Sequence, residues 1–189
     1  KLITCLFSFT LLANLSMNAQ TVQWASEVID FSTELTPVQY SAQQVLGKPN
    51  VLPAGGENPS AWTPDRANKE EFIKVGFANP MKIQQIAIAE SYNPSAITNV
   101  FTYDAAGNEY LVHTFSPNPV PIKSRVRNVF MDLTTYDVAA VKIEFDGAAV
   151  PEYYSIDAIA ITDSDIPIYA EIDIPAALND GIVIDRLND

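Results

Sequence analysis

The sequence has little of the chemistry on which most metal centres and nucleic-acid-binding proteins depend. Its 189 residues include one Cys and one His, so the set of thiolate and imidazole ligands that a zinc site needs is not present. Lys and Arg number 11 against 23 Asp and Glu, which gives a net charge of −12 at pH 7. A chain this acidic repels nucleic acid and anionic membranes. Zinc enzymes, nucleic-acid binders and basic membrane binders are therefore excluded.

Long hydrophobic runs are also scarce, and the clearest one lies at the N-terminus. Leu2–Ala13 is mostly apolar, follows Lys1 and precedes the small-residue pattern of Ser16–Ala19. This pattern predicts a secretory signal peptide over residues 1–19, with a buried N-terminal helix as the alternative. The run is shorter than the roughly 20 residues that cross a bilayer, so no membrane span is expected. Because Cys5 lies inside the leader, the mature chain is predicted to have no disulfide. We expect export to the periplasm, the outer membrane or the cell surface.

Beyond the leader, apolar and polar residues alternate with the period of β-strands. Gly107 and Asn108 form a hairpin signal between two such segments, and Ser41–Leu46 forms one short helical turn ended by Gly47. The spacing predicts an all-β fold, an antiparallel β-sandwich or jelly roll, over residues 22–162. Strands are expected at 72–77, 83–89, 100–103, 110–115, 129–133, 138–145 and 155–162, and residues 23–31 are consistent with an edge strand.

Residues 163–189, the C-terminal tail, do not keep the regular alternation of apolar and polar residues seen in the expected strands before them. Pro167 and Pro175 interrupt it, and the alternation stops before the last residue. We interpret residues 163–189 as a connector toward a downstream region that this sequence does not contain. For residues 168–174, a final strand that closes the same domain is an equal alternative.

Candidate catalytic groups are few. His113 alternates with apolar residues along one expected strand, and no Gly-x-Ser-x-Gly turn accompanies it. The carboxylates of Glu70, Glu71, Glu90 and Asp157 could supply a glycosidase pair, but the sequence places no two of them at a working separation. The chain is therefore predicted not to be an enzyme, with an envelope hydrolase as the least favoured alternative.

The segment from Tyr40 to Asp65 is a long stretch of turn residues that ends near a single Trp, "YSAQQVLGKPNVLPAGGENPSAWTPD". Loops of this length are usually functional or disordered, and the Trp argues against disorder. Trp62 either stacks on a sugar ring or plugs the base of the barrel and pins the loop. Hard cations take carboxylates and backbone carbonyls from irregular loops. The loop therefore also offers a weak calcium site, with Asn50, Glu57 and Asp65 as ligands.

The order of several motifs resembles the discoidin-type, galactose-binding-like jelly roll. The motifs are "YSAQQVLGKPN", a loop leading to "AWTPD", then "EFIKVGFANPMKIQQIAIAES" and the late strand "SIDAIAI". The resemblance covers residues 22–162 and implies that loops at one end of the sandwich bind glycans or other surface ligands. Gly47-Lys48 stands where that family often has Asp, which puts a carried-over calcium site in doubt. The candidate ligand-binding residues are Trp62, Tyr40, Asn50, Asn58, Glu90, Tyr92, Tyr153 and Tyr154.

The same segments more closely resemble the N-terminal module of large exported OmpA-family proteins of Gram-negative bacteria. That resemblance implies a β-propeller-like region downstream and contact with peptidoglycan through a domain absent from this sequence. The expected function is a non-catalytic binding or assembly module of an outer-membrane-associated protein. Its partner is a glycan, or alternatively an envelope protein that docks on a structural spacer.

Overall fold

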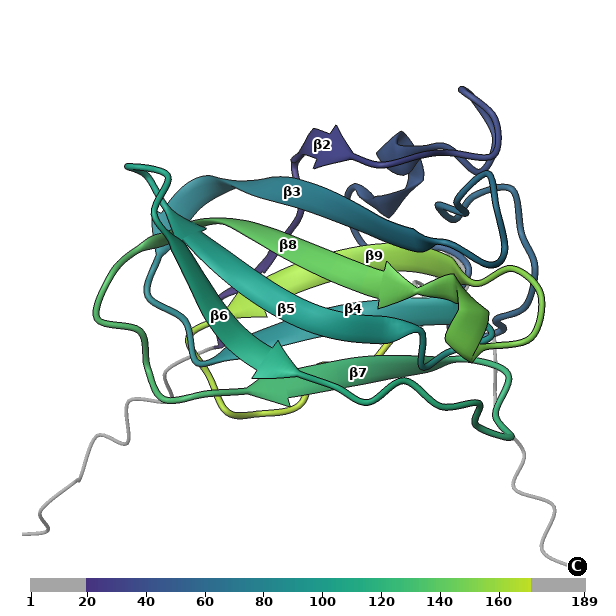
Figure 1. Ribbon diagram of the computed structural model, residues 1–189. Coiled ribbons are helices and arrows are strands. Elements are labelled where there is room, and N and C mark those ends of the chain that lie inside the picture. The colour runs from purple at the N-terminus through teal and green to yellow at the C-terminus, as the bar shows by residue number, and fades with distance from the viewer. Residues whose placement is uncertain (1–19, 171–189) are drawn as a thin grey trace, which may run out of the picture.

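A computed structural model describes residues 20–170, which form two antiparallel sheets packed face to face (Figure 1). One sheet has the strand order β1-β9-β4-β7, and the other has the order β2-β3-β8-β5-β6. The all-β sandwich predicted from the alternation is confirmed. The predicted signal peptide and residues 171–189 of the predicted connector lie outside the described residues. Within the described part, no helix is long and apolar enough to cross a membrane.

The strands follow the turn signals of the sequence closely, and the helical turn expected after Ser41 is a short 3-10 helix. The elements are β1 (Val22–Trp24), β2 (Glu27–Phe31), η1 (Ala42–Val45), β3 (Glu70–Met81), β4 (Gln85–Tyr92), β5 (Ile97–Asp104), β6 (Glu109–Thr114), β7 (Arg125–Phe130), β8 (Val138–Asp146), η2 (Gly147–Ala149) and β9 (Ser155–Thr162).

The core lies between the sheets and is built by the apolar face of each strand. In the four-stranded sheet, Ile86 and Ile88 of β4 pair with Ile161 and Ile159 of β9, and all four side chains are fully buried. Successive side chains point to opposite faces of a strand. The residues between these isoleucines, alanines such as Ala87, therefore lie on the outer face, where they are also buried.

Residues 163–170 cover part of this alanine-rich outer face. Ile168 is 6 % exposed and packs against Ala87 and Ala160. Its N–H donates to Oδ1 of Asn128 at 3.1 Å, and its carbonyl accepts from Nδ2 of the same side chain at 3.0 Å. The described part of the predicted connector is thus packed on the sandwich, and it forms no strand of either sheet.

Replacing Ile168 by alanine is expected to lower the free energy of unfolding by about 2 kcal/mol, because it removes buried apolar contacts. Ile166→Ala is a matched control: Ile166 is 57 % exposed, and exposed substitutions usually change stability by less than about 0.5 kcal/mol. Urea unfolding followed by circular dichroism measures both. Equal midpoints for the two variants would mean that the tail contributes nothing to the fold.

Two strand predictions differ from the structure for identifiable reasons. The segment 23–31 is not one edge strand, because it crosses between the sheets at Ala25 and Ser26, whose N–H groups donate to Ile159 and Gly76 respectively. The strand expected at 129–133 is β7, which begins four residues earlier. Its core-facing positions include Arg125 and Arg127, so apolar and polar residues do not alternate along its first half and the sequence did not predict a strand there.

Candidate ligand-binding site at the loop face

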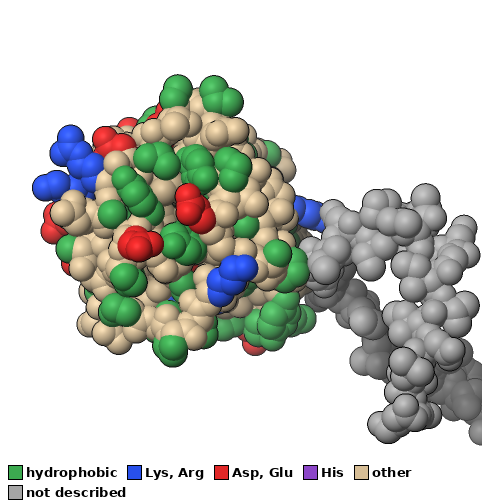
Figure 2. All heavy atoms as spheres, turned by 90° about the vertical axis from the view of Figure 1, so that its right-hand side faces the viewer, with side chains coloured by type: hydrophobic (Ala, Val, Ile, Leu, Met, Phe, Trp, Pro, Cys, Tyr) green, Lys and Arg blue, Asp and Glu red, His purple; other side chains and the backbone are tan. Residues whose placement is uncertain are grey.

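Three loops meet at the end of the sandwich where β3 begins and β8 ends, at the right of Figure 1. They are residues 40–65, 92–96 and 147–154, and we call the surface they form the loop face. Figure 2 looks onto this end of the molecule and shows hydrophobic side chains spread over it, with a few acidic and a few basic side chains among them. A rigid scaffold that presents several loops together is the usual setting for recognition.

Trp62 fixes the end of the long loop from inside. Its side chain is fully buried, its Nε1 donates to the carbonyl of Thr33 at 2.9 Å, and its ring centroid lies 5.4 Å from that of Phe145. The backbone of Trp62 also pairs with Ile156 of β9, through N···O distances of 2.8 and 2.9 Å. The ring has no face open to a sugar. Of the two interpretations, sugar stacking and pinning of the loop, the structure supports the second. Trp62 is therefore not a candidate for contact with a ligand at the surface.

Asp157, the residue after Ile156, fixes the start of the same loop. Its carboxylate accepts from the backbone N–H groups of Asn50, Val51 and Leu52 at 3.1, 3.0 and 2.9 Å. Burial raises the pKa of Asp157 and outweighs the three backbone donors, which lower it. The sequence offered Asp157 only as a glycosidase carboxylate. In the structure, it is an anchor inside the fold.

Two of the predicted tyrosines lie half-buried on the loop face, each beside a carboxylate. The hydroxyl of Tyr40 donates to Glu57 at 3.4 Å, and that of Tyr92 donates to Glu152 at 3.2 Å. Burial is the largest cause of the raised pKa of both phenols, and the neighbouring glutamates raise it further. Both phenols are therefore neutral at physiological pH and can donate hydrogen bonds.

Asn93 ties the second loop to the third. Its Nδ2 donates to the carbonyls of Pro151 and Tyr153, both at 2.6 Å. The hydroxyl of Tyr153 in turn donates to the carbonyl of Asp65 at 3.3 Å, which reaches the end of the first loop. Tyr40, Tyr92 and Tyr153 thus lie on three loops that hydrogen bonds join into one surface. The sequence analysis missed Asn93 and Glu152, although the Asn-Pro pair at 93–94 is a turn signal.

Backbone strain is concentrated at this surface. Among residues 20–170, the non-glycine residues with positive φ are Tyr40 (57°), Asn93 (42°), Ser95 (98°) and Glu152 (60°), and all belong to the loop face. Such conformations cost about 1–3 kcal/mol each and are held where the surrounding structure imposes them, often at ligand sites. The non-glycine residues with positive φ in the described part of the chain are thus gathered on the loop face.

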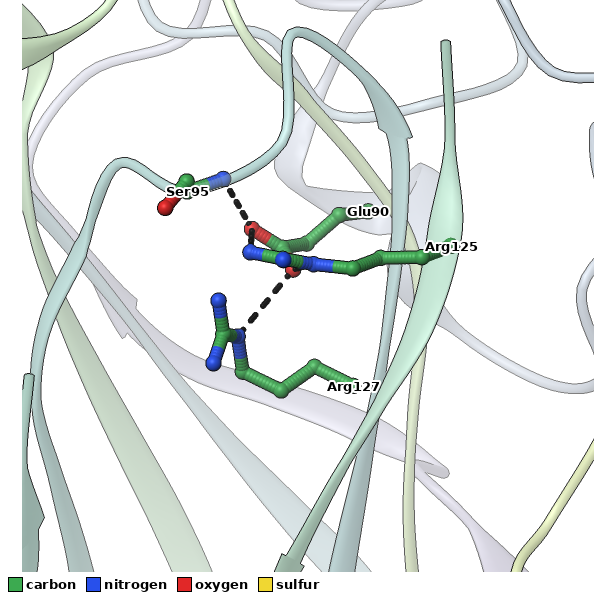
Figure 3. A network of polar contacts seen from close by, with 4 residues as sticks. All are labelled: Glu90, Ser95, Arg125 and Arg127. Carbon is green, nitrogen blue, oxygen red and sulfur yellow. Dashed lines mark hydrogen bonds and ion pairs between the residues drawn. The ribbon is translucent and has the colours of Figure 1, made fainter. Parts of the chain in front are cut away.

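Glu90, predicted to offer hydrogen bonds to a ligand, instead lies under the loop face in a network of the protein's own groups (Figure 3). Its side chain is 2 % exposed. One carboxylate oxygen accepts from Nε of Arg125 at 2.5 Å and from Nε of Arg127 at 3.3 Å, and the other accepts from the N–H of Ser95 at 2.5 Å. The network ties β4, β7 and the 92–96 loop together. Its role is to hold that loop in place.

The remaining candidates divide between the core and the loops. Tyr154 is 1 % exposed and packs against Phe145 with a centroid distance of 5.1 Å, so it belongs to the core. Burial also raises the pKa of its hydroxyl, which has no hydrogen-bond partner among the described residues. Asn58 caps a turn by accepting from the N–H of Ser60 at 2.9 Å. Asn50 is exposed, and its backbone N–H is bound to Asp157.

The three candidate calcium ligands, Asn50, Glu57 and Asp65, contact different partners and form no common group. Asn50 lies above Asp157, Glu57 accepts from Tyr40, and the carboxylate of Asp65 lies 3.7 Å from Arg66. In the described part of the chain, no group of three or more His, Cys, Asp or Glu side chains is placed to hold a metal ion.

His113 has the surroundings of a surface residue. It is exposed on β6, and its ring centroid lies 4.2 Å from that of Phe115. Within residues 20–170 it forms no hydrogen bond to a Ser, Asp or Glu side chain, so the geometry assembles no triad around it.

Comparison with known proteins identifies related folds. The family model described as "PAPPA: Pappalysin-1, SD scarf domain, C-terminal" matches residues 14–166. F-box/LRR-repeat protein 4 of Bos taurus is 20% identical over 187 residues, which cover 77% of this chain and 29% of that protein. The chain thus spans less than a third of the length of this curated relative.

Two solved structures illustrate what the same fold can carry. The family 32 carbohydrate-binding module from Streptococcus pneumoniae EndoD superposes with a TM-score of 0.55 at 11% identity, covering 75% of this chain and 99% of that one. Reduced XRCC1 bound to the DNA pol beta catalytic domain superposes with a TM-score of 0.53 at 15% identity, covering 75% of this chain and 97% of that one. At these identities the likeness shows a shared β-sandwich fold.

Proposed function

Since the chain belongs to the family of the pappalysin-1 SD scarf domain, C-terminal, and has the sandwich fold of carbohydrate-binding modules, we propose that it is a non-catalytic glycan-binding module. The binding surface is the loop face. The observation that carries the proposal is the set of three half-buried tyrosines, Tyr40, Tyr92 and Tyr153, on strained loops held to one another by hydrogen bonds.

The chemistry of this surface suits a sugar. Aromatic rings pack against the apolar face of a pyranose while their hydroxyls remain available for hydrogen bonds. The carboxylates of Glu57 and Glu152 lie beside the phenols and can accept from sugar hydroxyls, and such charge-assisted bonds are the stronger kind. Because the acidic side chains repel anions, the proposed ligand is a neutral glycan. The shared fold of the Streptococcus pneumoniae module supports this class of ligand.

Replacing Tyr92 by alanine is expected to weaken binding of a neutral glycan at least about tenfold, the loss typical of an aromatic contact at the centre of a site. A glycan array should first find the ligand, and isothermal titration calorimetry should then compare the variants. Tyr110→Ala is the control, because Tyr110 lies on β6 and stacks on Tyr136 at a centroid distance of 3.9 Å, beside the 104–109 hairpin at the left of Figure 1.

Two outcomes would contradict the proposal. One is that Tyr110→Ala weakens glycan binding as much as Tyr92→Ala. The other is that a well-folded chain binds no glycan of a broad array.

Protein docking is the second candidate function. The structure of XRCC1 bound to the DNA pol beta catalytic domain favours it, because a protein with the same fold there binds a protein partner. Val38 is 74 % exposed beside the loop face and offers an apolar contact. On this proposal the partner is an envelope protein, and the chain is the module of an exported, outer-membrane-associated OmpA-family protein. Crosslinking at residue 38 in cells, with mass spectrometry of the product, tests it. A product containing only this chain would count against it.

Export and calcium binding stay predictions. Edman sequencing of secreted protein should begin after Ala19 if the leader is cleaved as expected. If calcium binds the loop face, it should raise the unfolding temperature and EDTA should reverse the shift, because a ligand that binds the folded state stabilises it; an unchanged unfolding temperature would agree with the separation of Asn50, Glu57 and Asp65 in the structure.

A further inference from the structure

A hollow of about 470 Å³ lies at the end of the five-stranded sheet where β3 begins and β8 ends, and its volume is within the range of small-ligand sites, about 300–1,000 Å³. It lies over the first residues of β3 and β5 and the last residues of β8. None of the loop-face tyrosines lines it. Its lining residues are Glu70, Glu71, Phe72, Thr98, Asn99, Glu144 and Phe145.

Strand register explains how the floor of the hollow is built. Glu144 of β8 pairs with Phe72 of β3 on one side and with Asn99 of β5 on the other. The neighbouring row, Ile73 and Ile143, is fully buried in the core. Since side chains alternate along a strand, Phe72, Glu144 and Asn99 lie side by side on the outer face, an aromatic ring, a carboxylate and an amide in one row.

The carboxylate in this row is held in a defined position. Nδ2 of Asn99 donates to one oxygen of Glu144 at 3.0 Å, and Nζ of Lys142 lies 2.6 Å from the other. Burial raises the pKa of Glu144, but the bonds from Lys142 and Asn99 outweigh it and lower the pKa below its ordinary value. Thr114 donates to Oδ1 of Asn99 at 2.9 Å and so orients the amide. Glu144 therefore presents a fixed negative charge at neutral pH.

The same face already holds two ammonium groups of the protein over aromatic rings. Nζ of Lys142 lies 5.3 Å from the ring centroids of both Phe72 and Phe101, and Nζ of Lys74 lies 3.3 Å from that of Tyr103. Attraction of a cation to a ring face is strongest within about 6 Å. The aromatic rings and Glu144 thus form an ammonium-binding surface, and Lys142 shows where an ammonium sits on it.

We infer that this hollow is a second binding site, for a sugar that carries a free amino group. Of the carboxylates in the described lining, those of Glu70 and Glu144 reach solvent, whereas Glu71 is buried and accepts from Ser32 and Thr33. The basic side chain beside Glu144 is Lys142, whose ammonium already binds there, and this favours a cationic ligand and opposes an anionic one. Phe72 supplies a ring for the pyranose, and Thr98 and Asn99 supply neutral partners for its hydroxyls. The ligand's ammonium takes the place of Lys142 between Glu144 and Phe72. The inference takes its class of ligand from the proposed glycan recognition, at a different surface.

Calorimetric titration of the 189-residue chain with a β-1,4-linked glucosamine oligomer tests the site, at slightly acidic pH and low salt. Glu144→Gln should weaken binding about tenfold, the size of one charge-assisted contact. Lys142→Met should strengthen it severalfold, because it removes the competing ammonium and leaves the carboxylate and the ring free. A gain of affinity is a result that general destabilisation would not give.

Three controls separate this site from simpler explanations. Lys82→Met removes one positive charge from an exposed residue in the turn between β3 and β4 and should leave the affinity unchanged. Tyr92→Ala should also leave the affinity unchanged, whereas that variant is expected to weaken binding of a neutral glycan at the loop face at least about tenfold. In the Tyr92→Ala variant, where the loop face contributes little, the N-acetylated oligomer of the same length should bind at least tenfold more weakly than the glucosamine oligomer, because acetylation removes the charge.

The inference is overturned if Lys142→Met strengthens binding no more than Lys82→Met, or if the N-acetylated oligomer binds the Tyr92→Ala variant as well as the glucosamine oligomer does. Equal binding of oligolysine would also overturn it, because the surface would then select an ammonium without a sugar. If the glucosamine oligomer binds as expected while no neutral glycan binds the loop face, the proposed function fails and the second site stands.

Discussion

Replacing Trp62 by alanine is expected to lower the free energy of unfolding by about 3–5 kcal/mol, the usual cost of deleting a buried aromatic side chain. The ring is fully buried and contacts both Phe145 and Tyr154, with centroid distances of 5.4 and 6.3 Å. Its removal also leaves the carbonyl of Thr33 without the indole donor. Since domains are stable by only about 5–15 kcal/mol, a large part of the population should unfold on mild heating.

Urea unfolding followed by circular dichroism measures the effect of Trp62→Ala without depending on indole fluorescence. Trp62→Phe is the graded control, because it keeps an aromatic ring beside Phe145 and loses the bond to Thr33; we expect an intermediate loss of stability. If Trp62→Ala retained its stability and lost glycan binding instead, the tryptophan would be a ligand contact and the pinned-loop account would be wrong.

The second large effect is expected at Glu90. Changing it to glutamine removes the negative charge that Arg125 and Arg127 share, and leaves two guanidinium groups beneath the loop face without a carboxylate (Figure 3). Breaking a buried ion pair on one side typically costs about 3–5 kcal/mol, because the remaining charge has no partner. The side chains of Glu90, Arg125 and Arg127 are 2 %, 23 % and 20 % exposed. Solvent can therefore stabilise the two unpaired guanidinium groups only in part.

The ion pair between Lys142 and Glu144 supplies the control for Glu90→Gln, since it lies nearer to solvent at 22 % and 31 % exposure. Glu144→Gln should cost no more than about 1 kcal/mol. A triple variant with leucine at 90, 125 and 127 should regain much of the stability lost in Glu90→Gln, because well-packed apolar residues often replace a buried charge network. Equal stability of Glu90→Gln and Glu144→Gln would show that the network contributes little.

The sandwich could be predicted because its core strands follow simple alternation. Segments such as 72–77 and 138–145 place every second residue in the core, and their neighbours in the sheet have the same pattern. The pattern failed where the core face carries charge. Arg125 and Arg127 point inward on β7, where Glu90, on a different strand, neutralises their charge and the ring of Phe115 packs against Arg127.

The candidate site was less predictable than the fold, because its residues act through partners far along the chain. Asn50 and Asp157 are 107 positions apart, and nothing in either local sequence indicates that one anchors the other. Aromatic residues near turns were a usable signal, and they drew attention to Tyr40, Tyr92 and Tyr153, which the structure places half-buried on the loop face. The same signal could not separate them from Trp62 and Tyr154, since only three-dimensional packing decides which rings are covered.

The two anchors of the long loop fall on neighbouring residues of β9, Asp157 for its start and Ile156 for Trp62 near its end. The segment between Leu52 and Trp62 is therefore attached to the sandwich at both ends by the same short stretch of β9. Lengthening a flexible loop whose ends are already fixed costs little, because closure entropy grows only with the logarithm of its length. We therefore expect insertions between Pro53 and Ala61 to leave the sandwich folded, provided that the bonds of the Gly56 N–H to Ser91 and of the Tyr40 N–H to Pro59 are kept.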